Sequence, residues 1–335
     1  MAELVAAFGS SHSVMLAATR EDWIANFRKT DPRMPLFDKH GVRRSYDELL
    51  ALAPPSAAEL VTPDRLGKAF DRTFAAIANL KRQIADIELD ALIVVGDDQH
   101  ELFHDAMMPS LAIYYGETIR NAARPTPPPS DWYALAQSRR YEPETEVHYP
   151  VHSGLARHLI EQLTAAEFDV CALREIQPDQ HEGHAFSYIH RNYLTPRVVA
   201  IVPVFINTYY PPNAVAPGRC VTLGRALQRA IAAWPGDLRV GIFASGGLSH
   251  FIVDEELDLA VLDAIRAGDI GYLAGLDPKR LQAGSSEIRG WICAAAASVQ
   301  AGLMPKWIDY IPAYRTPALT GIGLGFARWG KADER

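Results

Sequence analysis

The stretch ALIVVGDDQH, residues Ala91 to His100, changes character halfway along. Its first five residues are apolar and rich in Val and Ile, which is typical of a strand buried on both faces of a sheet. At Gly96 the run gives way to two carboxylates, an amide and a histidine. The end of a rigid strand holds side chains in fixed positions, so this point suits a functional site. A solvated turn would carry the same residue types.

Similar apolar runs recur along the chain and alternate with helical patterns. The other predicted strands are Leu4–Phe8, Arg197–Ile206 and Leu238–Ala244. The predicted helices, which carry apolar residues at helical spacing, are Pro63–Ile87, His152–Glu167, Cys220–Trp234, Asp254–Ile265 and Ser286–Ala301. This alternation predicts an α/β fold with a central mixed sheet flanked by helices. In such folds, ligands bind at the carboxyl ends of the strands.

The chain has 335 residues, which is enough for one large domain or two ordinary ones. The segment RPTPPPSDW, Arg124 to Trp132, cannot form regular structure, because proline lacks an N–H donor and restricts its neighbours. We expect it to cross the surface of one domain, since apolar strands lie on both sides of it. The prediction is therefore a single catalytic domain over residues 1–335. Within it, residues 20–57 are less regular and form either a lid over a pocket or a contact surface for a partner.

Composition limits the partners and the location. A formal net charge of −7 argues against nucleic acid, whose phosphates require a basic face. No apolar run approaches the roughly 18 residues of a membrane span, and the first residues lack the basic region of a signal peptide. Three widely spaced cysteines predict no disulfide framework and a reducing compartment. We expect a cytoplasmic protein with no membrane or nucleic-acid partner, and homo-oligomerisation stays open.

Histidines follow several of the apolar runs. Three runs end in small or polar residues and then deliver His12, His100 and His250, and a separate polar segment presents His184. A lone histidine after a strand is more often a hydrogen-bonded loop residue than a ligand. Histidines that arrive at one edge of a sheet from different parts of the chain can nevertheless converge on a metal.

A carboxylate would complete such a site. The predicted helix that begins near Asp254 has Glu255, Glu256 and Asp258 in its first turn, where acids favour the positive end of the helix dipole. This placement explains the acids without any function, and it leaves open that one of them faces a metal. Two histidines and one carboxylate on one face of an ion form the facial triad of non-heme Fe(II) oxygenases.

Six segments carry a resemblance that covers nearly the whole chain. They are GSSHSVML, VVGDDQHELFHDAMMPSLAI, HEGHAFSYI, VPVFINTYYPPNAVAPGRC, SGGLSHF and VDEELD. In this order they resemble the class III extradiol ring-cleavage dioxygenases, the family that includes the catalytic subunit of protocatechuate 4,5-dioxygenase. The resemblance implies Fe(II) held by His12, His100 and Glu256, with His184 as the catalytic acid/base. It also implies that O2 cleaves a catechol-type aromatic ring beside the diol, which gives a ring-opened semialdehyde or keto acid.

The second-ligand segment departs from the family pattern. That segment often ends in Asn-Asp-His or Pro-Asp-His, whereas this chain has Asp-Asp-Gln-His. A slip of one residue would move the ligand from His100, and His104 and His40 are the further candidates. Asp97 or Asp98 either orients a ligand ring or satisfies the amides of the turn.

The substrate and the rival functions are less closely defined. Tyr209 and Asn213 could line a pocket for an aromatic ring, although a Pro-Pro turn with tyrosines packed in the core explains them equally well. His250 either binds substrate or O2, or supports the site. The rivals are a zinc-dependent hydrolase and a non-catalytic binding protein on the same fold. Which aromatic diol is the substrate stays open.

Overall fold

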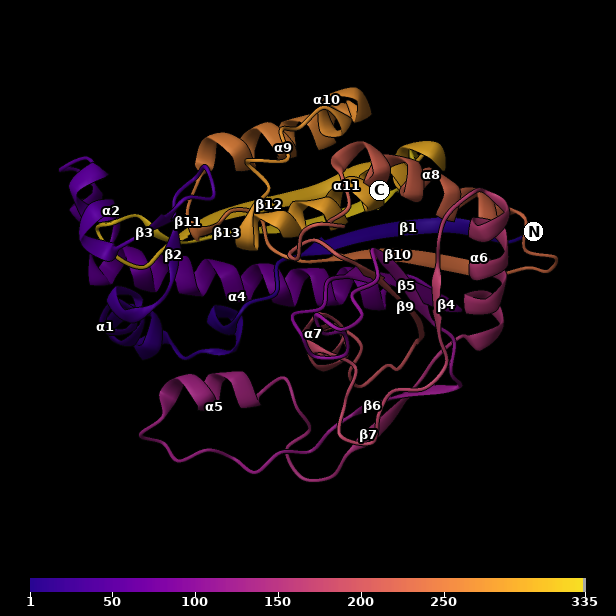
Figure 1. Ribbon diagram of the computed structural model, residues 1–335, viewed down its shortest axis with the longest axis horizontal. Coiled ribbons are helices and arrows are strands. Elements are labelled where there is room, and N and C mark those ends of the chain that lie inside the picture. Colours follow the sequence, from indigo (N-terminus) through magenta and orange to yellow (C-terminus); the bar gives the residue numbers. More distant parts are fainter. Residues whose placement is uncertain (334–335) are drawn as a thin grey trace.

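The computed structural model describes residues 1–333, and one mixed nine-stranded sheet runs through it (Figure 1). Its path is β11-β13-β1-β10-β4-β9-β5-β8, and β12 also pairs with β13. The strands are β1 (Glu3–Ser10), β4 (Ala91–Gly96), β5 (Leu111–Tyr114), β8 (Cys171–Leu173), β9 (Ala200–Ile206), β10 (Arg239–Ser245), β11 (His250–Ile252), β12 (Met304–Tyr314) and β13 (Thr320–Gly330). Both ends of the chain therefore contribute to one sheet.

The centre of the sheet is parallel. β1 pairs with β10, β10 with β4, and β4 with β9, all in parallel register. The antiparallel strands β13 and β5 flank this block on its two sides. Every residue of β4 is buried, which matches its unbroken apolar sequence. Because the four central strands run the same way, the residues that follow them meet at one edge of the sheet.

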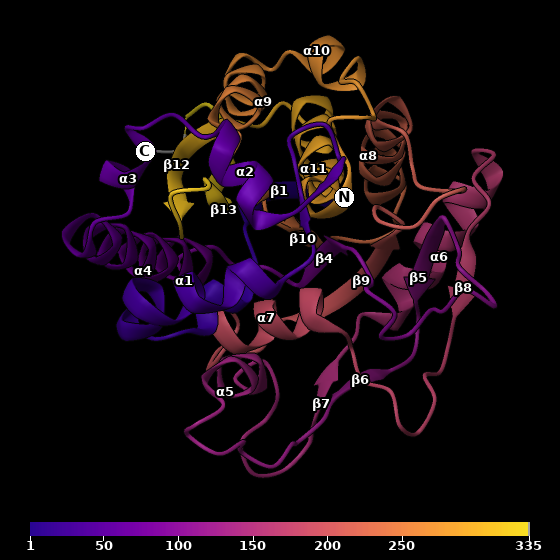
Figure 2. The same cartoon turned by 60° about the vertical axis from the view of Figure 1, so that its left-hand side comes forward.

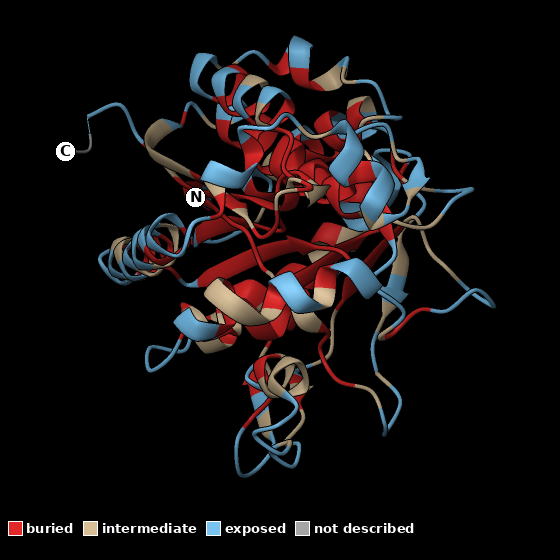
Figure 3. Ribbon diagram, turned by 90° about the vertical axis from the view of Figure 1, so that its left-hand side faces the viewer, coloured by how far each residue is buried: buried red, intermediate tan, exposed pale blue. Residues whose placement is uncertain are grey.

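Helices cover both faces of the sheet (Figure 2). One core cluster joins the sheet to α6 (Ser153–Ala165), α8 (Pro217–Ala232), α9 (Glu255–Ala267), α10 (Ile270–Ala274) and α11 (Ile288–Gln300). The cluster on the opposite face joins it to α4 (Pro63–Ala85) and α7 (His184–Asn192). Buried residues fill the space between these layers, while the outer helix faces are exposed (Figure 3). Helix α11 is buried over its first eleven residues, Ile288 to Ser298.

The fold class expected from the sequence is confirmed, as are its four strands and five helices, each with ends shifted by a few residues. Strands β12 and β13 were not expected. The proline segment Arg124–Trp132 lies in the excursion between β6 (Thr118–Asn121) and β7 (Val147–Pro150) and is exposed apart from the half-buried Pro127 and Trp132. None of the helices over residues 1–333 has both the length and the apolar character that crossing a bilayer requires.

The irregular stretch over residues 20–57 forms short elements at the open edge of the sheet. They are η2 (Asp22–Asn26), α1 (Phe27–Thr30), η3 (Asp31–Arg33), β2 (Leu36–Phe37), β3 (Arg43–Arg44) and α2 (Tyr46–Leu52). Trp23 and Phe27 anchor the stretch, because both are buried in the cluster that contains α4. The stretch is thus fixed over the strand ends at which the predicted histidines arrive.

Candidate active site

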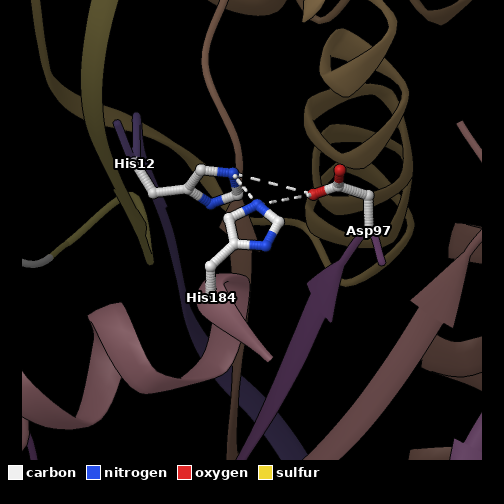
Figure 4. A group of neighbouring side chains, drawn as sticks. All are labelled: His12, Asp97 and His184. Atoms are coloured by element: carbon white, nitrogen blue, oxygen red, sulfur yellow. Dashed lines mark hydrogen bonds and ion pairs between the residues drawn. The ribbon is translucent and has the colours of Figure 1, made fainter. Parts of the chain in front are cut away.

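Three side chains from distant parts of the chain meet at the carboxyl edge of the sheet. His12 follows β1, Asp97 follows β4, and His184 is the first residue of α7. Figure 4 shows them pointing toward one another. The two Nε2 atoms lie 3.1 Å apart, and Asp97 Oδ1 lies 3.6 Å from His12 Nε2 and 3.7 Å from His184 Nε2. His12 and Asp97 are buried, so these polar atoms face one another rather than water.

Glu287 is a fourth member of the group, and it was missed in the sequence. Its Oε2 lies 3.5 Å from His12 Nε2 and accepts a hydrogen bond from the backbone N–H of Gly247 at 2.5 Å. Glu287 is the last residue before α11, a helix that is buried on all sides over residues Ile288 to Ser298. An acid in such a segment has no solvated face, so it must be paired inside the protein. A single acid directly before a long, mostly apolar segment was therefore the signal in the sequence that marked Glu287.

The hydrogen bonds of His12 determine which ring nitrogen faces the group. Ser245 Oγ donates to the backbone oxygen of Ala185 at 2.6 Å, so its only hydrogen is committed. His12 Nδ1 lies 3.0 Å from the same Oγ and must therefore be the donor in that contact. The proton of a neutral His12 ring is then on Nδ1, which leaves the Nε2 lone pair directed at the centre. A metal ligand needs this arrangement.

His184 has the opposite character. Its Nδ1 lies 2.6 Å from Glu101 Oε2, and its backbone N–H also donates to the Glu101 carboxylate at 3.0 Å. Burial lowers the pKa of His184, but the carboxylates of Glu101 and Asp97 outweigh burial and raise it to about 9. Burial likewise raises the pKa of Glu101, yet His184 and Arg140 hold it well below its usual range. These carboxylates favour the imidazolium form of His184, and in that form its Nε2–H is directed toward His12 Nε2, 3.1 Å away.

The carboxylates of Asp97 and Glu287 differ in their hydrogen bonding and in the direction of their pKa shifts. Among the described residues, Asp97 Oδ1 is buried without a hydrogen-bond partner. Burial and the charge of Glu287 raise the pKa of Asp97. Burial also raises the pKa of Glu287, but His12, His250 and the Gly247 amide outweigh it and lower that pKa. The Gln99 amide nitrogen lies 3.2 Å from Asp97 Oδ2 and 3.5 Å from Glu287 Oε1, and so spans both groups.

This donor set fits a divalent first-row metal ion. Asp97 Oδ1 and Glu287 Oε2 lie 3.6 Å and 3.5 Å from His12 Nε2, and such separations suit ligands about 2.0–2.2 Å from a common ion. An imidazole lone pair and carboxylate oxygens suit such ions, Fe(II) included. A cation would also satisfy the orphaned Asp97 oxygen and reduce the repulsion between Asp97 and Glu287.

The structure does not assemble the expected triad of His12, His100 and Glu256. The side chain of His100 is 37% exposed, forms an ion pair with Asp105 at 3.2 Å and stacks on Tyr210 with ring centroids 4.1 Å apart. Its backbone is left-handed, at φ 61°, so the chain turns there and Gln99 takes the inward position. Glu256 is absent from the centre for another reason. Its side chain is 74% exposed in the first turn of α9, where it pairs with Arg280.

The alternatives for the second ligand also lie elsewhere. His40 is exposed, and the ring of His104 lies beside that of His100, with centroids 5.9 Å apart. The sequence left open whether Asp97 or Asp98 orients a histidine ring or satisfies the amides of the turn, and the structure gives the two residues different positions. Asp98 accepts hydrogen bonds from the backbone N–H groups of the turn that follows, whereas Asp97 faces the histidines. Burial raises the pKa of Asp98 to about 6.

A cavity of about 220 Å³ opens onto this group. Tyr209 and His250, both expected at the substrate, line it together with Gln99 and Tyr188. Asn213, the third expected substrate residue, does not. Its amide bonds to Asn207 and to the Met108 carbonyl oxygen, which fixes the Pro-Pro turn instead. The stretch over residues 20–57 supplies Phe27, Thr30, Asp31 and Met34 to the opposite wall.

Two comparisons with known proteins both give dioxygenases. The family model described as the catalytic LigB subunit of aromatic ring-opening dioxygenase matches residues 54–324, a span that includes Asp97, His184 and Glu287 and leaves out His12. The gallate dioxygenase of Pseudomonas putida KT2440 is 38% identical over 108 residues. That alignment covers 31% of this chain and 30% of the gallate dioxygenase, so the two are matched over less than a third of either length.

Proposed function

The chain belongs to the family of catalytic LigB subunits of aromatic ring-opening dioxygenases, and from this premise we propose that it is a non-heme Fe(II)-dependent extradiol dioxygenase. The proposed reaction opens a catechol-type ring with O2 to a semialdehyde or keto acid. One observation carries the proposal: Asp97 Oδ1 and Glu287 Oε2 both lie within 3.6 Å of His12 Nε2, and an ion-paired histidine, His184, faces His12 and Asp97. The likeness to a gallate dioxygenase supports the same class of substrate.

We assign the iron ligands as His12 Nε2, Asp97 Oδ1 and Glu287 Oε2. Asp97 and Glu287 thereby take the places first given to His100 and Glu256. We assign His184 to proton transfer rather than to the ligand set, because the carboxylates of Glu101 and Asp97 raise its pKa and favour its protonated form. Gln99 donates to both carboxylates and holds them in position.

Bound Fe(II) would supply open positions for the diol and for O2, and would lower the pKa of the diol hydroxyls. The chain supplies the proton transfer. His184 Nε2 lies 3.1 Å from the ligand atom of His12, within reach of a ring oxygen bound at the centre. Glu101 holds the other ring nitrogen at 2.6 Å and stabilises the protonated form. His184 is thus placed to exchange a proton with a ring hydroxyl in both directions.

The cavity indicates a small substrate. Its volume of about 220 Å³ lies below the roughly 300–1,000 Å³ of pockets for drug-sized ligands, so a single substituted ring suits it better than a fused or linked ring system. Tyr188, Tyr209 and Phe27 offer aromatic faces along its walls. The proposed substrate is therefore a one-ring aromatic diol.

The test is metal analysis of anaerobically purified protein, followed by oxygen uptake with a panel of one-ring diols. The proposal predicts bound iron, oxygen consumption with at least one diol, and the long-wavelength absorbance of a ring-opened product. Bound zinc without oxygen uptake would contradict it and favour a hydrolase. Iron without turnover of any diol would contradict it in favour of a binding protein.

A further inference from the structure

Helix α7 carries His184 as its first residue, but its own sequence does little to fix its position. It is nine residues long, and isolated helices shorter than about 12–15 residues are marginal in water. Its N-cap is Gly183, which has no side chain to bond the first turn and whose backbone is left-handed, at φ 79°. In Figures 1 and 2, α7 lies between the central sheet and the pair of strands β6 and β7. The position of His184 therefore depends on contacts that other parts of the chain make with α7.

Glu182 makes several such contacts just before α7 begins. Its side chain is fully buried, and Oε2 lies 2.6 Å from Nδ1 of His190, a fully buried residue in the last turn of the helix. Its Oε1 accepts a hydrogen bond from the amide of Asn121 at 2.9 Å, and its backbone N–H donates to the carbonyl oxygen of Arg120 at 2.9 Å. Asn121 and Arg120 both belong to β6. Glu182 thus joins the last turn of α7 to the neighbouring strand.

The ring of His190 is also held by β7. Tyr149 stacks on it, with ring centroids 3.9 Å apart and planes at 9°. The hydroxyl of Tyr149 donates to Glu142 Oε1 at 2.7 Å, and Glu142 Oε2 pairs with Arg191 of α7 at 2.7 Å. Within residues 1–333, His190 Nε2 is buried without a hydrogen-bond partner. In that range the bond to Glu182 is therefore the one hydrogen bond that orients this ring.

Glu101 and Glu182 act at opposite ends of α7. Glu101 bonds to the ring and to the backbone N–H of His184, so it fixes only the first residue of the helix. Glu182 fixes His190 in the last turn. Two fixed points set the direction of the helix axis, whereas one point would let the helix pivot. A buried ion pair often adds little net stability, and its best-attested use is to specify one arrangement of the chain.

We propose that Glu182 is a positioning residue: through His190 it fixes α7 so that His184 faces His12 and Asp97. The inference rests on the proposed function, because it concerns the residue that exchanges the proton there. His184 Nε2 lies 3.1 Å from His12 Nε2 and 3.7 Å from Asp97 Oδ1, and a pivot of α7 would change both distances. A misplacement of about 1 Å that originates far from the chemistry can cost about 10²-fold in rate.

Three substitutions at Glu182 test this by kinetics. Glu182→Ala removes both side-chain hydrogen bonds, and Glu182→Asp keeps the charge but is one methylene too short to reach both Asn121 and His190. Both variants should keep their iron and the KM of the wild type for a cleaved diol. The value of kcat should fall about 10²-fold in Glu182→Ala and less in Glu182→Asp. Glu182→Gln has the full length and can bond to both partners, so it should restore most of kcat.

Leu159→Ala is the control that separates positioning from stability. Leu159 is fully buried in α6 and belongs to the core cluster on the opposite face of the sheet from α7. Its truncation leaves a cavity and lowers the melting temperature. Below that temperature the variant should keep the kcat of the wild type. A loss of kcat equal to that in Glu182→Ala would reduce the role of Glu182 to stability and overturn the proposal.

Proton NMR of the metal-free protein gives a readout that needs no turnover. His184 Nδ1 and His190 Nδ1 each lie 2.6 Å from a carboxylate oxygen, and ring protons in such short bonds resonate far downfield of the amide protons. His184→Ala identifies the His184 signal by its loss. In Glu182→Ala and Glu182→Asp that signal should broaden or disappear, although the residues of its own bond, His184 and Glu101, are unchanged. Leu159→Ala should keep the signal.

An unchanged His184 signal in Glu182→Asp, together with the kcat of the wild type, would overturn the proposal even if Glu182→Ala does not fold. Loss of the signal in a protein that cleaves no diol would support the placement of α7 by Glu182 and reject the proposed function. Oxygen uptake with a diol, with signal and kcat unchanged in the Glu182 variants, would uphold the dioxygenase and reject the role of Glu182. The two failures therefore give different results.

Discussion

His12 donates a hydrogen bond from Nδ1 to the hydroxyl of Ser245, and that bond directs the Nε2 lone pair toward Asp97 and Glu287. Ser245→Ala should therefore weaken metal binding about 10- to 100-fold, the usual cost of losing a partner that orients a ligand. Titration of the protein with Fe(II) or Co(II) measures the effect. Ser298→Ala is the matched control, because it removes a buried hydroxyl bonded to a helix carbonyl in α11. Equal metal affinity of Ser245→Ala and the wild type would contradict the role of Ser245.

Glu287 and Glu256 give a direct comparison of the two assignments of the carboxylate ligand. Glu287→Gln replaces a buried carboxylate 3.5 Å from His12 by a neutral amide, so the purified variant should contain little iron. Glu256→Gln alters an exposed side chain that pairs with Arg280, and it should retain the iron and the activity of the wild type. Iron content by elemental analysis decides between them. A Glu287→Gln protein with full iron would remove Glu287 from the ligand set.

His184 and His12 should differ in what their loss removes. His184→Ala should keep its iron and lose about 10²- to 10⁴-fold in kcat, because only proton transfer is removed. His12→Ala should lose the metal, since two carboxylates alone hold it weakly. Iron content and kcat are measured on both variants. An iron-free His184→Ala protein would make His184 a ligand, and a fully active one would make it a bystander.

Asp258 should make the protein less stable as the pH rises through the acid range. Burial raises its pKa from 3.8 to about 7, although Ser249 and Tyr310 donate hydrogen bonds to it. Between about pH 4 and pH 7 the folded protein therefore holds a proton that the unfolded chain releases, and the free energy of unfolding falls with rising pH. The effect amounts to about 4 kcal/mol at most. Asp258→Asn cannot ionise, so the difference in unfolding free energy between variant and wild type should grow in favour of the variant over this range. Urea unfolding at several pH values tests it, and a constant difference would contradict it.

The central strands could be predicted because burial on both faces leaves an unbroken apolar run, as in β4. Strands β12 and β13 could not. Most of β12 is only half-buried, so its sequence shows no apolar run. In β13, glycine recurs at alternate positions, which weakens any β signal. The reason for one of these glycines lies in the tertiary structure: a Cβ at Gly323 would overlap the carboxylate of Asp258.

The site could be predicted only in part, for a related reason. His12 and His184 lie in motifs that can be read from the sequence, and the structure places both at the centre. The choice between Glu256 and Glu287 depends on which helix has an exposed face. Helix α9 exposes Glu256 to solvent, whereas α11 is enclosed. The turn after β4 determines whether Gln99 or His100 faces the centre, because the left-handed backbone at His100 directs its side chain outward.

The position of β1 in the sheet has a consequence for biosynthesis. β1 ends at Ser10, yet its two neighbours are β10, which begins at Arg239, and β13, which begins at Thr320. During synthesis β1 must therefore stay unpaired until these later strands have been made, and long-range pairing of this kind is slow. His12 reaches Glu287 only after α11 has emerged. Iron can then enter a finished centre only after α11 has been made.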